Sequence, residues 1–376
     1  MMIYRYRSIL LLSMFSVSSN VFSKVLPSIN KIKTNVYIYN NRPSFRMNEP
    51  DKKKKEIQEE QRQGQEQRQG QEQRQEKTIK HIVMSGGGAM GFAYYGALRE
   101  SHQKGIWKHE DIETIYGTSI GTIMGVIISL GYDWSILDDF MIKRPWHHVF
   151  KFQLPMALNV ITKQGVFDKT VIQDIFLPLF KGKDIPIDIT LKDLYDLTKR
   201  EIHFITTEIN NLETEDISYK THPEWKVVDA AYASCCLPFL FSPFFLEEGS
   251  KGSKGLGSVV PKAYIDGGIL MNFPLNLCLS HGIDPKEIMT IRRIDGKTKR
   301  TGFYTNSTLF EIGFSLILKL IEKIEIPLSI SNQEIGHSID IENSVYNLYS
   351  YIYNCVNSEE ARKELVELGV RSNIYI

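Results

Sequence analysis

Residues 112–131 read IETIYGTSIGTIMGVIISLG and contain the most informative motif of the sequence. Its first five residues are typical of a short buried strand, and its second half is an apolar run typical of a helix that ends at Gly131. Between the two lies Gly-Thr-Ser-Ile-Gly, which fits the motif G-x-S-x-G in the strand–helix context that this motif requires. The stretch therefore predicts a sharp turn that carries Ser119 at its tip, with Gly117 and Gly121 on either side.

The same order of strand, glycine turn and helix occurs once more, upstream. Residues 81–84, His-Ile-Val-Met, read as a buried strand that leads through a serine into three glycines. A helical pattern from Ala89 to Lys104 follows, with Gly105 as its cap. Further short strands are expected at 201–208 and 263–266, and further helices at 169–180 and 191–198. This alternation predicts an α/β fold with a mainly parallel central sheet.

The two glycine turns together suit acyl transfer. The sharp turn lifts the hydroxyl of Ser119 clear of the sheet, at the positive N-terminal end of the following helix. The upstream turn offers backbone N–H groups that can converge on a developing oxyanion. The candidates for such an oxyanion hole are Gly86, Gly87, Gly88, Ala89 and Gly91.

A nucleotide-binding interpretation competes for the upstream turn, because its glycines also satisfy G-x-G-x-x-G. A dinucleotide site needs an acidic residue at the end of the second strand to hold the ribose. Here that strand ends in Tyr-Gly-Thr-Ser, although Glu110 and Asp111 lie nearby in the sequence. The end of the second strand lacks this acidic residue, which disfavours a dinucleotide site.

Ser119 also needs a base. In α/β hydrolases with a Ser-His-Asp triad the histidine comes last in the chain, which leaves His281 and His337 as candidates, and neither lies in a recognisable motif. An acid, Asp266, stands at the end of the strand 263–266 and is followed by Gly267 and Gly268. Taken alone, this tripeptide is an ordinary strand-end turn.

The three motifs G-G-G-x-x-G, G-T-S-I-G and D-G-G, in this order, resemble those of the patatin-like phospholipase family. The block A-A-Y-A-S-C-C-L-P at 230–238 is similar to the family's Ala-Ser-x-x-x-Pro, and Asn272-Phe273-Pro274 is similar to its Asn-x-Pro. About 200 residues, from Lys80 to roughly Leu279, are covered. The resemblance implies a three-layer α/β/α hydrolase core.

The resemblance also implies a function and a mechanism. Members of the family hydrolyse lipid acyl esters with a Ser-Asp dyad and no histidine, so Ser119 would be the nucleophile and Asp266 its base, without metal or other cofactor. One position departs from the family: Met90 stands where a lysine or arginine usually precedes the last glycine of the first motif. Two alternatives stay open, a non-catalytic lipid-binding protein of the same fold and a Rossmann-type nucleotide-binding protein.

Composition limits the partners. Lys and Arg number 45 and Asp and Glu 44, so the net charge of +1 provides no general attraction for nucleic acid. The four cysteines show no metal-ligand spacing and no C-x-x-C pair. The resemblance implies a lipid bilayer or lipid aggregate as the partner surface, and a protein activator is a further candidate; the oligomeric state stays open.

The sequence suggests four segments. Residues 1–23 join two arginines to a short apolar run, which suits a signal peptide or an anchor, so the location stays open between the cytoplasm and a membrane surface. Residues 24–79 contain Gln/Glu/Arg repeats that cannot build a core and read as a disordered linker. Residues 80–280 would form the catalytic domain, and residues 281–376 a mostly helical C-terminal extension whose final helix stops at Gly369.

Overall fold

The computed structural model describes residues 78–151, 164–246, 261–295, 309–324, 331, 334–343 and 348–372. The chain divides into two compact units, Met1–Gln73 and Arg74–Ile376, and every described residue lies in the second. The expected signal or anchor at 1–23 and nearly all of the expected linker at 24–79 lie outside the described residues. None of the described helices is long and apolar enough to cross a membrane.

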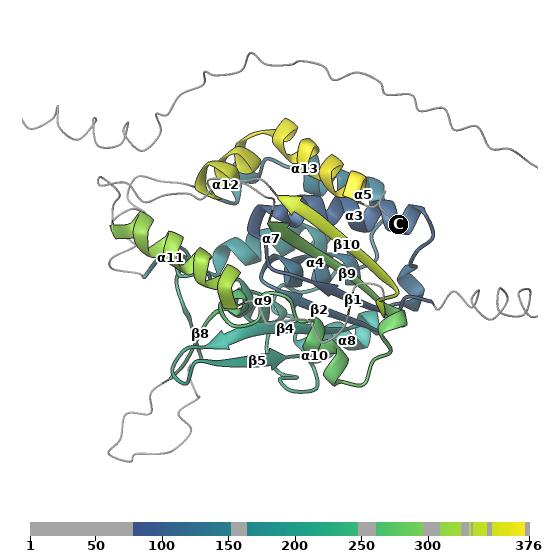
Figure 1. The fold of residues 1–376 in the computed structure, drawn as a ribbon, viewed down its shortest axis with the longest axis horizontal. Coiled ribbons are helices and arrows are strands. Elements are labelled where there is room, and N and C mark those ends of the chain that lie inside the picture. The colour runs from purple at the N-terminus through teal and green to yellow at the C-terminus, as the bar shows by residue number, and fades with distance from the viewer. Residues whose placement is uncertain are drawn as a thin grey trace, which may run out of the picture. The chain divides into compact units, whose positions relative to one another are not determined.

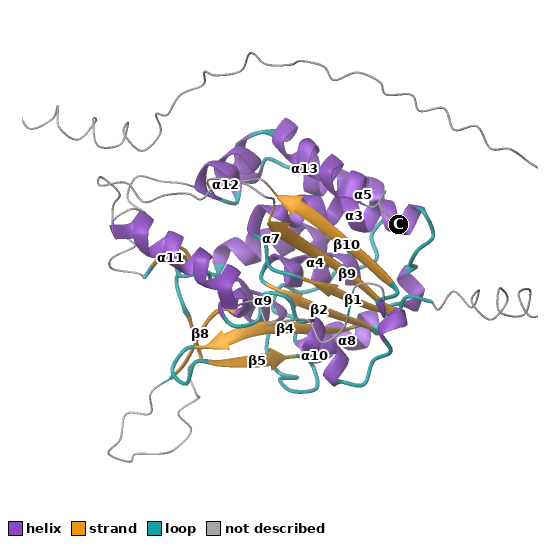
Figure 2. Ribbon diagram, in the orientation of Figure 1, coloured by secondary structure: helices purple, strands orange, loops and turns teal. Residues whose placement is uncertain are grey.

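A central sheet organises this unit (Figures 1 and 2). Five neighbouring strands run parallel in the order β10, β9, β1, β2, β4. Their bounds are β1 His81–Met84, β2 Thr114–Thr118, β4 Glu201–Glu208, β9 Ile288–Asp295 and β10 His337–Asn343. The predicted α/β fold with a mainly parallel sheet is confirmed.

Beyond β4 the sheet turns antiparallel. β4 pairs with β5 (Glu213–Ile217) and with β8 (Lys262–Asp266), and β8 pairs with β7 (Phe244–Leu246). A separate two-stranded sheet joins β3 (Gly165–Phe167) to β6 (Phe239–Phe241).

The strands β2 and β8 share one edge of β4. β2 pairs with residues 201–205 of β4, and β8 pairs with residues 206–208. β5 pairs with residues 204–208 and so overlaps both, which means that β5 occupies one edge of β4 and that β2 and β8 both lie on the other. The last residue of β2, Thr118, lies opposite Ile205, and the last residue of β8, Asp266, lies opposite Thr206. Because β8 runs antiparallel to β4, the two strands point at each other and their carboxyl ends meet.

The two faces of the sheet differ in composition. The even residues of β1, Ile82 and Met84, belong to the large core, whereas Val83 belongs to a smaller cluster beneath α10 (Leu275–Ser280). The large core packs against α3 (Gly91–Gln103), α4 (Ile120–Ser129) and further helices. These are α5 Trp134–Asp138, α7 Thr170–Lys181, α8 Leu191–Thr198, α9 Val227–Cys235, α12 Leu348–Asn357 and α13 Glu359–Ser372.

Short turns of helix connect these elements. They are η1 Gly88–Met90, η2 His109–Asp111, η3 Asp139–Lys143, η4 Trp146–His148, η5 Gly267–Ile269 and η6 Pro285–Glu287. The remaining helix, α11 (Leu309–Ile324), packs against η5. Figure 1 shows α11 on the side of the molecule toward which β4 points.

The residues after 280 contribute more than helices. β9 and β10 join the parallel sheet, and α13 packs along α3. Alternate residues of each strand lie on the face of the sheet beneath α10, called the polar face here because Arg292 pairs with Asp340 on it. Neither strand therefore has the continuous apolar run of a strand that is buried on both faces. The expected domain boundary at residue 280 stays a prediction.

Gly369 does not end the last helix, which continues to Ser372. A Cβ atom at Gly369 would lie 1.8 Å from the carbonyl oxygen of Ala93 in α3. The glycine therefore serves close packing of α13 on α3. Gly105 does follow its helix as expected, with φ +75° and its N–H donated to the carbonyl of His102.

Candidate active site

Ser119 sits at a strained turn between β2 and α4. Its φ of 53° and ψ of −123° are unusual for a residue with a side chain, and such backbone costs about 1–3 kcal/mol. The flanking glycines are sterically required: a Cβ atom at Gly117 would lie 2.5 Å from the backbone nitrogen of Thr122, and one at Gly121 would lie 2.6 Å from the carbonyl oxygen of Met84. The local sequence thus permits a turn that a β-carbon on either side would prevent.

The side chain of Ser119 contacts Asp266. Its hydroxyl donates to Oδ2 of Asp266 over 2.6 Å, although 147 residues separate the two in the sequence. The meeting of β2 and β8 on one edge of β4 explains this proximity. The second carboxylate oxygen, Oδ1, accepts from the N–H of Gly268 over 2.8 Å. A Cβ atom at Gly267 would lie 2.1 Å from the carbonyl oxygen of Ile205, so only glycine fits there.

Burial sets the acidity of this carboxyl group. Asp266 is only 3% exposed, and burial raises its pKa to about 6, against the lowering effect of the hydrogen bonds from Ser119 and Gly268. Both hydrogen-bond donors are neutral. A carboxyl group with a pKa near 6 accepts a proton more readily than an exposed aspartate and is still ionised at neutral pH.

Ser234 in α9 holds the backbone of the turn. The N–H of Ser119 donates to Oγ of Ser234 over 3.0 Å, and that hydroxyl donates to the carbonyl of Ile205 over 2.6 Å. Ser234 lies in the Ala-Ser-x-x-x-Pro block, whose sequence alone predicts no contact with Ser119. The block can be recognised in the sequence. The contact of Ser234 with Ser119 cannot, because 115 residues separate the two and no local pattern links them.

The upstream glycine turn lies beside Ser119. A Cβ atom at Gly86 would lie 3.4 Å from Cβ of Ser119. The N–H of Gly86 donates to the carbonyl of Asn272, and the N–H of Gly91 is directed to the carbonyl of Gly88. These two N–H groups are already engaged, whereas the N–H groups of Gly87, Gly88 and Ala89 open the short helix η1.

Gly91 has a packing role. A Cβ atom there would lie 2.5 Å from Cγ1 of Ile120, the first residue of α4. The start of α3 can therefore approach the start of α4. This approach brings the first turns of both helices together next to Ser119.

Comparison with known proteins identifies the family. The model of patatin-like phospholipases matches residues 82–279, which is more than half of the chain. The chain belongs to the patatin-like phospholipase family. The resemblance inferred from the three motifs is thus confirmed.

The sequence is similar to viral proteins. It is 24% identical over 202 residues to an uncharacterised protein of Acanthamoeba polyphaga mimivirus, covering 54% of this chain and 62% of that protein. It is 23% identical over 207 residues to a probable lipid hydrolase of Invertebrate iridescent virus 6, covering 54% and 65%. The chain thus spans less than two thirds of the length of these relatives.

Solved structures match more distantly. VipD from Legionella pneumophila aligns with a TM-score of 0.40 and 17% identity, covering 77% of this chain and 67% of that one. Human GIVD cytosolic phospholipase A2 aligns with a TM-score of 0.41 and 11% identity, covering 79% and 58%.

Met90 stands where the family resemblance led us to expect a lysine or arginine. Its side chain is fully buried, at the end of η1 and within the large core. A lysine or arginine in this buried position would need a partner for its charge, because burying an unpaired charge is costly. Met90 therefore supports the glycine turn through packing and contributes no charge.

Neither histidine considered as a base reaches the site. His281 follows α10, and its Nδ1 hydrogen-bonds the hydroxyl of Tyr116. His337 is the first residue of β10, at the far edge of the sheet. Within the described part of the chain, no histidine is hydrogen-bonded to Ser119 or Asp266.

The dinucleotide interpretation gains no support from the fold. Glu110 and Asp111 lie in η2, which precedes β2, whereas the glycine turn follows the carboxyl end of the parallel strand β1. The acids and the glycines therefore lie at opposite ends of the sheet.

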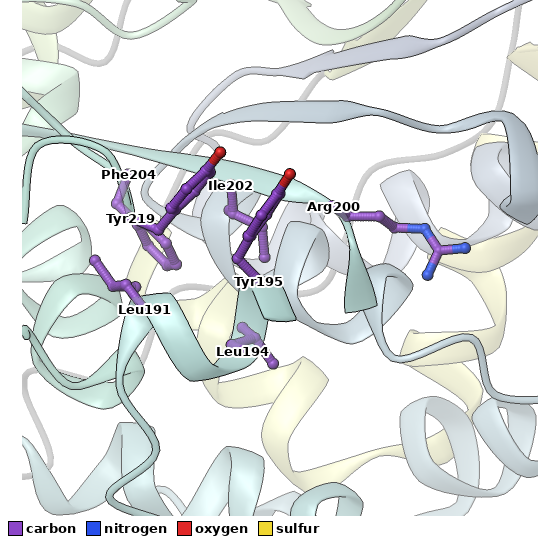
Figure 3. Close-up of a pocket in the computed structure, with 7 residues that line it drawn as sticks. All are labelled: Leu191, Leu194, Tyr195, Arg200, Ile202, Phe204 and Tyr219. Carbon is purple, nitrogen blue, oxygen red and sulfur yellow. The ribbon is translucent and has the colours of Figure 1, made fainter. Parts of the chain in front are cut away.

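A small pocket elsewhere is unrelated to this site. Figure 3 shows its lining, in which the rings of Tyr195 and Tyr219 stack with centroids 3.8 Å apart. The other lining residues are Leu191, Leu194, Arg200, Ile202 and Phe204. Arg200 points away from the tyrosines and donates to the carbonyls of His109 and Ser129. None of the candidate site residues lines this pocket.

Proposed function

We propose that this protein is a lipid acyl hydrolase that cleaves fatty-acyl esters with Ser119 as nucleophile and Asp266 as base. The observation that carries the proposal is the 2.6 Å hydrogen bond from the hydroxyl of Ser119 to the buried carboxylate of Asp266. Membership of the patatin-like phospholipase family supports the lipid ester as substrate.

The proposed reaction has two halves. Oγ of Ser119 attacks the acyl carbonyl carbon while its proton passes to Oδ2 of Asp266. The resulting oxyanion is stabilised by the N–H groups of Gly87, Gly88 and Ala89, and the alcohol leaves with the proton from Asp266. Water then attacks the acyl-enzyme and gives a proton to Asp266, the fatty acid departs, and Ser119 regains its proton. No imidazole is needed, because the carboxylate contacts the hydroxyl directly.

The helix α11 supports a lipid surface as the place of reaction. Four large apolar residues at steps of four are 39–52% exposed: Ile312, Leu316, Leu320 and Ile324. The opposite side of the helix faces the protein, where Phe314 is buried. Near the start of the helix, Gly313 lies against the ring of Phe239. Because α11 packs on η5, directly after Asp266, this exposed stripe adjoins the proposed site. We propose that the stripe inserts among lipid acyl chains.

The reaction is tested by fatty-acid release from vesicles that contain phospholipid and neutral lipid. The full chain is used, because β9, β10 and α13 are integral to the core. Wild type should release fatty acid and Ser119→Ala should not, whereas the exposed control Ser280→Ala should equal wild type. Host-cell extract is added in one arm to supply a protein activator. Wild type that binds vesicles but stays inactive in every arm would replace the proposal with the lipid-binding alternative.

The lipid surface is tested by sedimentation with the same vesicles. A leucine side chain gains about 1.5–3 kcal/mol when it moves fully from water to hydrocarbon, so replacing two half-exposed leucines should weaken binding about tenfold. Leu316→Ala with Leu320→Ala is compared with Leu197→Ala in α8, which is 59% exposed and lies next to the start of β4. Equal binding by both variants would remove α11 from the lipid contact.

A further inference from the structure

A second cluster of chemically active side chains lies on the polar face of the sheet. His203, Asp216 and His281 each offer a ligand atom, and these three atoms lie within 4.8 Å of one another. His203 is in the middle of β4, Asp216 is near the end of β5, and His281 directly follows α10. We propose that these three residues bind one divalent cation of the zinc type.

The sheet positions the first two ligands. Asp216 lies opposite Ile205, one pleat along from His203, so both side chains project from the same face as a diagonal cross-strand pair. Nδ1 of His203 lies 2.9 Å from both carboxylate oxygens of Asp216. Tyr116, opposite His203 in β2, stacks on the imidazole with ring centroids 3.9 Å apart. The ring of His203 is therefore fixed before any ion binds.

The other nitrogen of His203 faces a buried carboxylate. Nε2 lies 3.5 Å from Oε1 of Glu201, whose side chain is only 6% exposed. This oxygen accepts no hydrogen bond from the described residues, while Oε2 pairs with Lys220 over 2.7 Å. A histidine that binds a metal through one nitrogen typically donates its other N–H to a carboxylate. Glu201 stands where that partner is expected.

His281 completes the set. The hydroxyl of Tyr116 hydrogen-bonds its Nδ1 over 2.7 Å, which leaves Nε2 as the nitrogen for an ion. Two imidazoles and one carboxylate form the three-ligand set of many tetrahedral zinc sites that keep a fourth position open. Calcium and magnesium prefer sites built from oxygen alone, so the two imidazoles favour zinc. The exposed ring of His281 provides access from solvent.

An ion here would brace the frame of the proposed active site without taking part in the reaction. It would join the β4–β5 hairpin to the end of α10. The segment before α10 accepts two hydrogen bonds from that frame: the carbonyl of Met271 from Thr118, and the carbonyl of Asn272 from the N–H of Gly86. The site is independent of acyl transfer, so Ser119→Ala should bind zinc as wild type does.

The test is calorimetric titration of the full chain, freed of metal with a chelator, with ZnCl2 and in parallel with MgCl2 and CaCl2. Wild type should bind one zinc ion per chain and unfold at a higher temperature when zinc is present. Co²⁺ in place of zinc should give the strong visible absorption of a tetrahedral site. Asp216→Asn, which keeps the shape of the side chain, and His281→Ala, at an exposed position, should each bind zinc at least tenfold more weakly.

The control is His148→Ala, which removes one of two adjacent exposed histidines outside the cluster and should bind zinc like wild type. Absence of stoichiometric zinc binding by wild type would overturn the proposal and leave His203 as a buried imidazole hydrogen-bonded to Asp216. Undiminished binding by folded Asp216→Asn and His281→Ala would overturn it equally.

Discussion

Two carboxylates flank Thr206 in the same row of the sheet, and their pKa values are shifted in opposite directions. Asp266 pairs with Thr206 from β8, and Glu215 pairs with it from β5. The pKa of Asp266 is raised to about 6 by burial, whereas the pKa of Glu215 is lowered to about 2 by hydrogen bonding to His222, with further contributions from Tyr264 and from the charge of Lys262. One carboxylate is buried among neutral donors, and the other is half-buried next to a lysine and a histidine. The burial and the neighbouring groups of a carboxylate therefore determine whether it is suited to accept a proton.

The largest expected contrast is in activity. Asp266→Asn removes the proposed base and should lower kcat/KM for lipid hydrolysis by about 10³–10⁴-fold, which is within the range that a positioned general base contributes. Glu215→Gln changes a carboxylate in the same row and should alter kcat/KM less than about twofold, because ion pairs near the surface contribute little. Steady-state kinetics on one lipid substrate measures both. Equal losses would mean that the effect is structural.

Ser234→Ala should have an intermediate effect. It removes the acceptor of the Ser119 N–H and leaves this backbone group without its partner, so the strained turn loses its support. We expect kcat to fall about 10–100-fold, consistent with a displaced reacting group, while the pH midpoint of activity stays unchanged. The control is Ser129→Ala, which removes a different buried serine hydroxyl, at the end of α4. A shift of the pH midpoint would instead show that Ser234 influences the pKa of Asp266.

The pH dependence of kcat/KM should reflect the ionisation of Asp266 and not that of Glu215. Asp266 must be ionised to accept a proton, so kcat/KM should rise with pH and level off above about 6. Between pH 7 and pH 5 the activity should fall about tenfold, because the ionised fraction falls by that amount. Glu215→Gln should leave the midpoint in place. A midpoint near pH 4 in wild type would contradict the raised pKa.

The smallest expected effect is on stability, and its sign differs between the two residues. The folded-state pKa of Asp266 lies above its unfolded value, so its contribution to stability is present at low pH and is lost as pH rises through about 6. Asp266→Asn removes the cost of burying this charge at pH 8 but also loses its charge-assisted hydrogen bonds. We expect the free energy of unfolding at pH 8 to increase by about 1 kcal/mol as the net result.

Glu215 behaves in the opposite way. Its folded-state pKa lies below its unfolded value, so its contribution is present at neutral pH and is lost as pH falls toward 2. Glu215→Gln should destabilise the protein slightly at pH 8. Urea unfolding of both variants at pH 8 and pH 5 compares the two signs. Destabilisation by Asp266→Asn at pH 8 would show that the buried charge is better compensated than its environment suggests.

Local motifs made the fold and the family predictable from the sequence. G-T-S-I-G needs a strand before it and a helix after it, and both are present around Ser119. The Asp266 motif lies 147 residues later, and its contact with Ser119 was expected from the family resemblance rather than from the tripeptide itself. The catalytic role of both residues stays a prediction until it is measured.

Other features depend on contacts between distant segments. Ser234 reaches Ser119 across 115 residues, and His203 meets His281 only because α10 covers the polar face of the sheet. Gly369 resembled a helix stop because local sequence cannot reveal that α3 lies against it. Neither burial nor hydrogen-bond partners of Asp266 and Glu215 can be read from their neighbours in the chain, so their opposite pKa shifts required the structure.

Covalent labelling with an alkyl fluorophosphonate, followed by peptide mass spectrometry, tests whether Ser119 is the nucleophile and Asp266 its base. We predict a single stoichiometric adduct on Ser119, formed at a rate that rises with pH to a plateau above about 6 and that drops at least about 10³-fold in Asp266→Asn while Glu215→Gln labels like wild type. An adduct on another residue, or labelling of Ser119 at the same rate in Asp266→Asn, would contradict the account.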